Sequence, residues 1–260
     1  PKKSPIEIGK CVKPVRNKDD PTLCLDAYTE YMEIVKALEK EHIRIYTDGG
    51  RHVGNDSTGY GIRIIQHDNG SETILRQASE GLGNTSVSEA ELTAVYDALF
   101  WLHQEFKPKI PPIHIFTDST YTLNASASHL YKQKHYYIVQ ESQNIAYQIR
   151  AENNLIPIVI HYVPSHIEHT ILGLRRTGNY YADKLATEGV LKSTIQDNEK
   201  RLHNKFIREK ILNETIDLME SIETKLDIFN EPDSPPTASV VDDLGACVYA
   251  NRDPSLRGVP

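Results

Sequence analysis

Alternating apolar and polar positions mark the first strand-like segment of the chain, residues 43–48, because a period of two is typical of a strand with two distinct faces. Residues 113–118 form a second such segment, and both segments end in a Thr-Asp pair. The two glycines after Asp48 predict a turn of the backbone there. Strands that end alike can place Asp48 and Asp118 side by side, although like charges held close together are costly. A bound cation would remove that cost, so the pattern points to a metal site.

The rest of the pattern predicts a mixed sheet with helices packed on it. A hairpin signal at Asn69-Gly70 separates two further strands, after which the period changes to that of amphipathic helices. After the first strand we expect, in chain order, strands over 60–66 and 72–78, a helix from Ser88 to Phe106, the strand to Asp118, a helix through Tyr121 and Leu123, a helix over 137–152, a strand over 158–163 and a helix over 179–191. This order predicts an α/β fold with a five-stranded mixed sheet flanked by helices.

Changes in composition divide the chain into four parts. We expect residues 1–40 to comprise a linker and a lead-in helix: residues 1–25 are polar and interrupted by prolines, and the helix follows over 27–41. Residues 41–191 hold the ordered domain. Residues 192–229 are charged and helical in character, which predicts a C-terminal helical extension, and residues 230–260 are rich in Pro, Ser and Asp, which predicts a disordered tail. The chain starts with Pro-Lys-Lys rather than Met, so we expect it to be a piece of a larger polypeptide.

Composition and charge limit the function classes. The chain is 39% hydrophobic and 25% charged, as in globular domains, and no apolar run approaches the roughly 18 residues of a membrane span. The three cysteines follow no metal-ligand spacing, which favours a reducing, intracellular location, cytoplasmic or nuclear. A net charge of −7 argues against a protein that binds nucleic acid by bulk charge alone. We therefore expect no membrane partner, and only weak, salt-dependent binding of nucleic acid by this chain in isolation.

Four acidic residues lie where they could converge. Asp48 and Asp118 close strands, Glu91 lies in the first turn of a helix, and Asp183 lies in the first turns of the last helix. Carboxylates from several elements form a hard oxygen site that suits Mg²⁺. Two such ions about 4 Å apart can activate a water and stabilise the departing oxygen in phosphodiester hydrolysis. The four acids therefore suggest a metal-dependent nuclease.

Each of these acids also has a purely structural interpretation. Asp48 and the glycine after it could form a common turn. The segment Ser88-Glu89-Ala90-Glu91 fits a capping box, and Asp118-Ser119 could cap the following helix. Asp183 could simply interact favourably with a helix dipole. Only the order and context of these residues together favour the functional interpretation.

Five short motifs occur in a characteristic order. They are Tyr46-Thr47-Asp48-Gly49-Gly50, Ser88-Glu89-Ala90-Glu91-Leu92, Thr117-Asp118-Ser119, Val163-Pro164-Ser165-His166 and Gly178-Asn179-Tyr180-Tyr181-Ala182-Asp183. In this order they resemble the ribonuclease H family, over roughly residues 41–190. The last two motifs are most similar to the ribonuclease H domains of non-LTR retrotransposon polyproteins, in which the domain follows a reverse transcriptase.

The resemblance implies a ribonuclease H-like fold and an endonuclease that cuts the RNA strand of RNA–DNA hybrids, where the 2′-OH distinguishes RNA from DNA. It further implies a reverse transcriptase domain in the same polypeptide as a partner. The implied cofactor is Mg²⁺, as two ions for which Mn²⁺ can substitute. The family's four metal-binding carboxylates match Asp48, bridging both ions, Glu91 and Asp118 on one ion, and Asp183 on the other. The family's loop histidine matches His166, expected to assist proton transfer or product release.

The family's substrate-contacting positions match this sequence more loosely than its metal-binding positions do. Asn55, Ser86 and Ser88 lie where the family contacts its substrate. Arg175 and Arg176 could touch a backbone phosphate, or could lie in a solvated turn.

The sequence also departs from the family's pattern after the histidine motif. His166 and Asp183 are 17 residues apart, more than is usual in the family, so residues 167–178 should form an enlarged loop. His169 in that loop could compete with His166 for the catalytic role. Two other functions therefore stay open: a nucleic-acid-binding or scaffolding module that keeps the fold without activity, and another nuclease or transposase with this fold.

Overall fold

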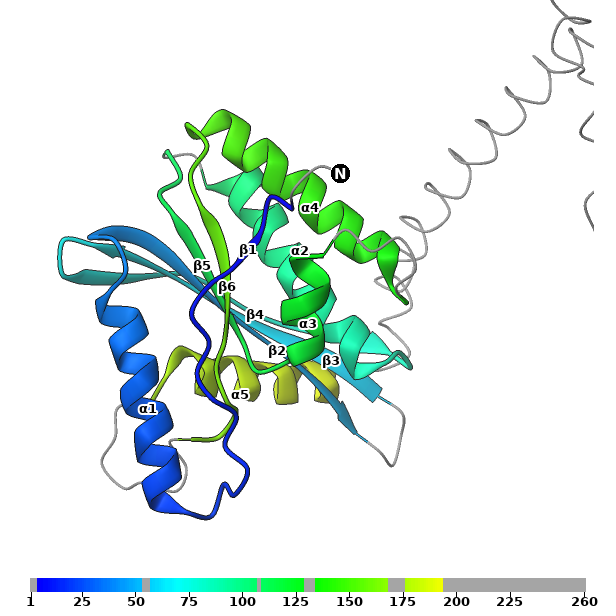
Figure 1. Ribbon diagram of the computed structural model, residues 1–260. Helices are drawn as coiled ribbons and strands as arrows, with labels where there is room; N and C mark the ends of the chain where they lie inside the picture. Colours follow the sequence, from blue (N-terminus) through cyan, green and yellow to red (C-terminus); the bar gives the residue numbers. More distant parts are fainter. Residues whose placement is uncertain (1–3, 53–56, 107–108, 129–133, 168–175, 194–260) are drawn as a thin grey trace, which may run out of the picture. The chain divides into compact units, whose positions relative to one another are not determined.

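The computed structural model describes residues 4–52, 57–106, 109–128, 134–167 and 176–193. Together they form one mixed sheet with the strand order β1-β6-β5-β2-β3-β4 (Figure 1). The strands are β1 (Glu7–Ile8), β2 (Glu41–His52), β3 (Ser57–Asp68), β4 (Ser71–Gly83), β5 (Ile113–Thr117) and β6 (Ile158–Tyr162). β2, β3 and β4 pair antiparallel, whereas the pairs β2–β5, β5–β6 and β1–β6 are parallel. The α/β class with a mixed sheet is confirmed, but the described sheet has six strands and not the five we expected.

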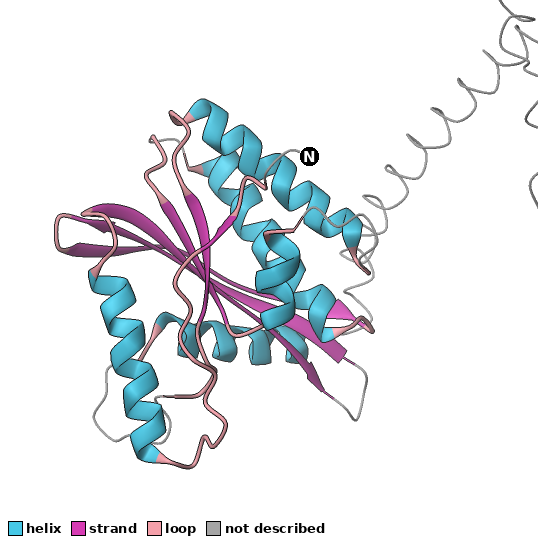
Figure 2. Cartoon of the chain, viewed as in Figure 1, coloured by secondary structure: helices cyan, strands magenta, loops and turns pink. Residues whose placement is uncertain are grey.

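Helices pack on both faces of this sheet (Figure 2). They are α1 (Pro21–Lys36), α2 (Val87–Glu105), α3 (Thr120–Ser126), α4 (Tyr136–Glu152) and α5 (Gly178–Lys192). One hydrophobic cluster joins Ile45 of β2 to Leu99 of α2 and Ile149 of α4. A second cluster joins Tyr46, the next residue of β2, to α1 and to Ala182 of α5. Alternate side chains of β2 therefore enter separate cores. None of the described helices is both long and apolar enough to cross a bilayer.

The N-terminal segment is built into the sheet, so the expected linker is wrong for the described residues before α1. β1 extends the sheet beyond β6, and the N–H groups of Gly9 and Val12 donate to backbone oxygens of β6, 2.9 Å away in both cases. Ile6 and Val12 are each only 1% exposed. The segment satisfies backbone groups at what would otherwise be an open sheet edge. It shows no periodicity because the strand itself is only two residues long.

The lead-in helix begins earlier than its apolar spacing predicted. α1 starts at Pro21, because the side chain of Asp20 accepts hydrogen bonds from the N–H groups of Thr22 and Leu23 at 2.9 and 3.3 Å. Proline suits the first helical position, where its missing N–H needs no partner. The helix ends at Lys36, five residues before the expected end at residue 41. The helical extension and tail predicted after α5 lie outside the described residues.

Strand β2 continues past the point where we expected a turn. Gly49 and Gly50 pair with Tyr60 and Gly59 of β3, and the strand ends only at His52. The turn expected after Asp48 is therefore wrong. The hairpin between β3 and β4 is confirmed, since its two loop residues have the positive φ angles that a tight hairpin needs, 45° at Asn69 and 91° at Gly70.

Three buried histidines lie on neighbouring strands, His42 on β2, His114 on β5 and His161 on β6. The two ring nitrogens of His114 lie 3.0 Å from His161 Nε2 and 2.8 Å from Glu39 Oε2. The other ring nitrogen of His161 lies 2.8 Å from the backbone oxygen of Lys10. Burial lowers the pKa of His42 and of His161 to about 4. These rings are therefore neutral in the folded protein at neutral pH.

We expect the stability cost of His161→Gln to depend on pH. The folded pKa of His161 is about 4, below its ordinary value of 6.5. As the pH falls from 6.5 to 4, the unfolded chain takes up a proton that the folded chain does not. The stability contributed by the neutral ring is therefore lost over this window, by up to about 1.4 kcal/mol per pH unit.

Urea denaturation of both proteins at about pH 7.5 and about pH 5 measures this cost, which should be smaller at the lower pH. His52→Gln, at an exposed position of β2, is the control for the loss of a histidine as such. The same cost for His161→Gln at both pH values would contradict the expectation.

Candidate active site

The parallel register of β2 and β5 brings two aspartates together. Thr47 is paired with Thr117, so Asp48 and Asp118 follow at neighbouring positions of the sheet. Together with Glu91 of α2, each offers a carboxylate oxygen, and the three oxygens lie within 4.8 Å of one another. The expectation that the two Thr-Asp strand segments place two carboxylates side by side is confirmed.

Gly49 lets α2 approach β2 closely enough for this convergence. A Cβ on Gly49 would lie 2.8 Å from the backbone nitrogen of Glu91 and 2.7 Å from its Cγ, closer than real Cβ atoms come. At Gly50 the only tight contact of a Cβ with a described residue would be with the end of the Val190 side chain, at 3.2 Å. The glycine pair thus serves the close packing of helices on β2 and not a turn.

Glu91 is available to the site because another residue caps its helix. The capping residue of α2 is Ser86, whose Oγ accepts from the N–H of Glu89 at 3.1 Å. Glu91 is therefore in the second turn, and the capping box assigned to residues 88–91 is wrong by two positions. Glu91 Oε2 instead accepts a hydrogen bond from Thr122 Oγ1 at 2.9 Å.

Asp118 does not cap a helix either. Ser119 caps α3 and accepts from the N–H of Thr122 at 3.1 Å. Ser119 also hydrogen-bonds to Glu91, which ties the start of α3 to α2. The carboxylate of Asp118 faces α5 instead, where Asn179 Nδ2 donates to its Oδ2 at 3.5 Å.

Asp183 and His166 lie at the edge of the acidic cluster. Thr177 caps α5, which places Asp183 in the second turn of the helix. Asp183 Oδ2 is 3.9 Å from His166 Nδ1, and both side chains are partly exposed. Asp183 also repels the charged forms of Asp48 and Asp118. His166 has a left-handed backbone, with φ 61°.

Burial and mutual repulsion hold the carboxyl groups away from their ionised state. Burial, followed by repulsion from Asp118, Asp183 and Glu91, raises the pKa of Asp48 well above its ordinary range. Burial raises the pKa of Glu91 to about 7, although its hydroxyl partners act in the opposite direction. Burial also raises the pKa of Asp118, against the lowering effect of Asn179 and His166. Carboxyl groups whose ionised forms are disfavoured by burial and by one another fit a divalent cation, which would stabilise those forms.

The residues expected to contact substrate have different environments. Ser86 Oγ lies 3.3 Å from His135 Nε2 in addition to its capping bond, and Ser88 is partly exposed. Arg176 is exposed, with its guanidinium carbon 4.3 Å from the ring centroid of Tyr180. Asn55, Arg175 and His169 lie outside the described residues, as does most of the loop expected over 167–178.

Sequence reasoning missed the polar residues that hold the carboxylates. Ser119 and Thr122 bond to Glu91, and Asn179 bonds to Asp118. Asn179 lies within one of the five motifs, and Ser119 within another, but neither position was assigned a partner. Thr122 had no local signal except its place three residues after the helix cap.

Comparison with known proteins decides the family, because the RNase H family model matches residues 40–191. The chain belongs to the RNase H family. The comparison with curated proteins gave no match.

Several solved RNase H structures are similar to the chain. The solution structure of the prototype foamy virus RNase H domain is 25% identical, with 60% of this chain and 98% of that chain covered and a TM-score of 0.44. The N-terminal RNase H domain of Rv2228c from Mycobacterium tuberculosis is 20% identical, over 57% and 98% of the chains, with a TM-score of 0.42. LC11-RNase H1 from compost, in complex with an RNA/DNA hybrid, is 25% identical, over 58% and 98%, with a TM-score of 0.41.

We expect Gly49→Ala to destabilise this RNase H domain by about 1–3 kcal/mol, the usual cost of overpacking. The added methyl group would meet the backbone of α2 at Glu91, which cannot move without displacing the helix. Gly50→Ala is the matched control and should cost less, because the end of the Val190 side chain can give way. Urea denaturation measures both variants, and equal costs would show that the close approach at Gly49 is not the constraint.

Proposed function

We propose that this RNase H domain is a metal-dependent endonuclease that hydrolyses the RNA strand of RNA–DNA hybrids. The observation that carries the proposal is the convergence of the Asp48, Glu91 and Asp118 carboxylates, within 4.8 Å of one another, inside a domain of this family. Folding alone gains nothing from three acids placed together at a largely buried position. A site for divalent cations accounts for the arrangement.

Asp48, Glu91, Asp118 and Asp183 are the residues that would hold the metal. We propose two Mg²⁺ ions, with Asp48 shared between them and Mn²⁺ as a substitute. When bound, such ions activate a water and neutralise charge on the phosphodiester. The raised carboxyl pKa values support this assignment, since they follow from burial and from repulsion between the neighbouring acids.

The surrounding side chains keep the carboxylates in place. Thr122 and Ser119 fix the Glu91 carboxylate from the start of α3. The N–H of Gly49 donates to Asp48 Oδ1 at 2.8 Å, and Asn179 directs the Asp118 carboxylate. A preorganised set of ligands avoids reorganisation when substrate binds.

His166 is the residue proposed to move protons or help release the product. Its Nδ1 lies 3.9 Å from the Asp183 carboxylate, at the edge of the proposed metal site. The partly exposed position of its side chain allows exchange of protons with solvent. A histidine at the edge of the acidic cluster can therefore act on a leaving oxygen without competing for the metal.

Substrate binding would use local contacts and not overall charge. The chain carries a net charge of −7, so attraction to the hybrid must come from a few positions. We propose Asn55, Ser86, Ser88, Arg175 and Arg176 for this role.

The proposed context is a retroelement polyprotein with a reverse transcriptase domain and an intracellular location, as in the retrotransposon domains with similar motifs.

The direct test is cleavage of a labelled RNA–DNA hybrid by the full chain at low salt. We expect cutting of the RNA strand that requires Mg²⁺ or Mn²⁺, and an activity loss of at least about 100-fold in Asp118→Asn. Glu188→Gln, at an exposed position of α5, is the control and should retain activity. Duplex DNA of the same sequence should not be cut, whereas equal cutting of it would indicate another nuclease with this fold.

A folded native chain that cuts no hybrid with either metal would contradict the proposal. Folding is checked by circular dichroism and by a cooperative unfolding transition. Binding of hybrid without cleavage would then favour a nucleic-acid-binding module that has kept the fold without the activity.

A further inference from the structure

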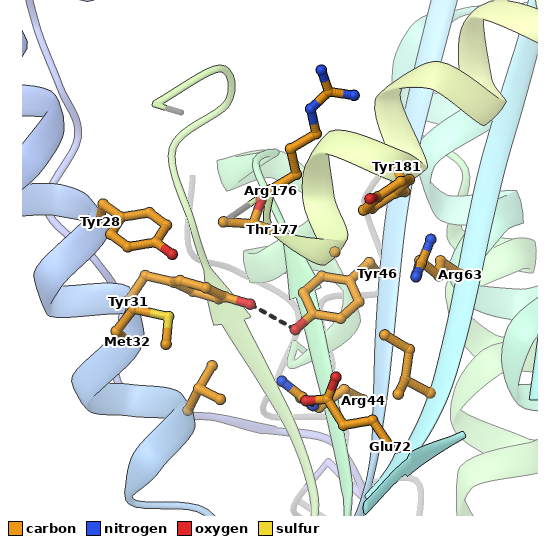
Figure 3. Close-up of a pocket in the computed structure, with 13 residues that line it drawn as sticks. Tyr28, Tyr31, Met32, Arg44, Tyr46, Arg63, Glu72, Arg176, Thr177 and Tyr181 are labelled. Carbon is orange, nitrogen blue, oxygen red and sulfur yellow. Dashed lines mark hydrogen bonds and ion pairs between the residues drawn. The ribbon is translucent and has the colours of Figure 1, made fainter. Parts of the chain in front are cut away.

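A cavity of about 160 Å³ lies between α1 and the start of α5. None of the four acids of the proposed metal site lines it. In Figure 3, side chains from α1, the central strands and the start of α5 surround this space. Its polar lining is dominated by arginine and tyrosine. The polar side chains that matter for its chemistry are Arg44, Arg63, Arg176, Tyr31, Tyr46 and Glu72.

The charges around the cavity do not balance. Among the described residues, three arginines line the cavity, but only one acidic residue does, Glu72. The carboxylate of Glu72 already forms an ion pair with Arg44. Within the described part of the chain, Arg63 and Arg176 form no ion pair. The lining residues therefore carry a net formal charge of +2 in a protein whose total charge is −7. This local excess of positive charge favours an anionic ligand.

Aromatic stacking holds the side chains of Arg63 and Arg176 without using their N–H groups. The guanidinium carbon of Arg63 lies 3.9 Å from the ring centroid of Tyr181, and that of Arg176 lies 4.3 Å from the ring centroid of Tyr180. Stacking occupies the face of a guanidinium and leaves the N–H groups at its edge free to bind an acceptor. Arg63 is thus held in position for a ligand that accepts hydrogen bonds, whereas the Arg176 guanidinium points away from the tyrosine pair in Figure 3.

Two buried donors at the cavity lack an acceptor among the described residues. They are Nε of Arg44 and Nε of Arg63. Arg44 is only 5% exposed. Buried N–H groups nearly always find an acceptor in folded proteins, because leaving one without a hydrogen bond is costly. An anion in the cavity would supply oxygen atoms as acceptors.

A pair of tyrosine hydroxyls adds further polarity. The Tyr31 and Tyr46 hydroxyl oxygens are 2.7 Å apart, as the dashed line in Figure 3 shows. A Cβ on Gly178 would meet the Tyr46 ring at 2.2 Å, so the start of α5 lies flat against this ring. The close packing of Gly178 against Tyr46 therefore forms one wall of the cavity.

We propose that this cavity binds a phosphoryl dianion, supplied either by inorganic phosphate or by a phosphate monoester such as the terminal phosphate of a nucleotide. The edge of a guanidinium matches the oxygens of a phosphoryl group, and charge-assisted bonds of this kind are strong. A tetrahedral dianion presents oxygens in several directions, as the Nε–H donors of Arg44 and Arg63 on two neighbouring strands require. The net formal charge of +2 on the lining residues would balance the charge of −2 on the dianion.

The test is calorimetric titration of the full chain with inorganic phosphate, adenosine 5′-monophosphate and adenosine, with EDTA present to exclude binding through a metal. We expect saturable binding of both phosphate compounds, with Kd of about 1 mM or lower, and none of adenosine. A similar Kd for the two would assign the site to the phosphoryl group alone. Tighter binding of the nucleotide would assign it to a phosphate monoester.

Substitutions locate the binding in this cavity. Arg63→Gln should weaken phosphate binding at least tenfold, and Arg63→Lys, which keeps the charge without the planar edge, should weaken it less. The lysine variant also serves if the glutamine variant does not fold. Arg76→Gln is the matched control, because Arg76 also lies over an aromatic ring, that of Trp101 at 5.7 Å, but outside the cavity. It should bind phosphate as the native chain does.

Three results would overturn the proposal: no saturable binding by the folded native chain, equal binding of adenosine, or equal weakening by Arg63→Gln and Arg76→Gln. The outcome is independent of nuclease activity. Asp118→Asn should bind phosphate as the native chain does in EDTA, so failure of the cavity and failure of the carboxylate site are distinguishable.

Discussion

Repulsion between carboxylates that the sheet holds together is the constraint on which the rest of the site depends. The parallel register of β2 and β5 fixes Asp48 beside Asp118, and the packing of α2 on β2 adds Glu91. These contacts are made by the backbone and the hydrophobic cores, so the acids cannot separate to relieve their repulsion. The folded domain therefore carries a cost at this point that a cation would remove.

The neighbouring residues are arranged so that the acids remain available for a ligand. Ser86 and Ser119 cap α2 and α3, so neither Glu91 nor Asp118 is occupied by a helix end. Gly49 has no side chain because the backbone of α2 occupies the space where a Cβ would lie. Asn179 reaches Asp118 from α5, on the other face of the sheet. Elements from both faces thus hold the same cluster.

The sequence predicted the fold class and the convergence of the two strand-end aspartates because both depend on local periodicity and on strand direction. It failed where two distant segments meet. Gly49 looked like a turn residue because its neighbour in α2 is some 40 positions away in the chain. β1 was missed because its partner is β6, and a two-residue strand has no period to detect. The partners of Glu91 were missed because they lie at the start of α3.

The two faces of the sheet have different chemistry. One is covered by α2 and α4 over an apolar core. The other carries histidine, arginine and tyrosine side chains from β2 and its neighbours, beneath α1 and α5. Polar groups in such a layer must be paired or supplied with a ligand. His114 bonds to His161 and to Glu39, whereas Nε2 of His42 and the Nε atoms of Arg44 and Arg63 have no partner among the described residues.

The central claim, that the clustered acids form a site for a divalent cation, is tested most directly by unfolding the native chain and Asp118→Asn with and without Mg²⁺ at about pH 8. Without metal, the variant should be more stable by about 1 kcal/mol, because one source of repulsion is gone. With saturating Mg²⁺ the order should reverse, since binding stabilises the native fold by about 2.7 kcal/mol at a hundred times Kd. Glu188→Gln should show neither effect. A variant that is less stable than the native chain in EDTA, or no reversal with Mg²⁺, would contradict the account.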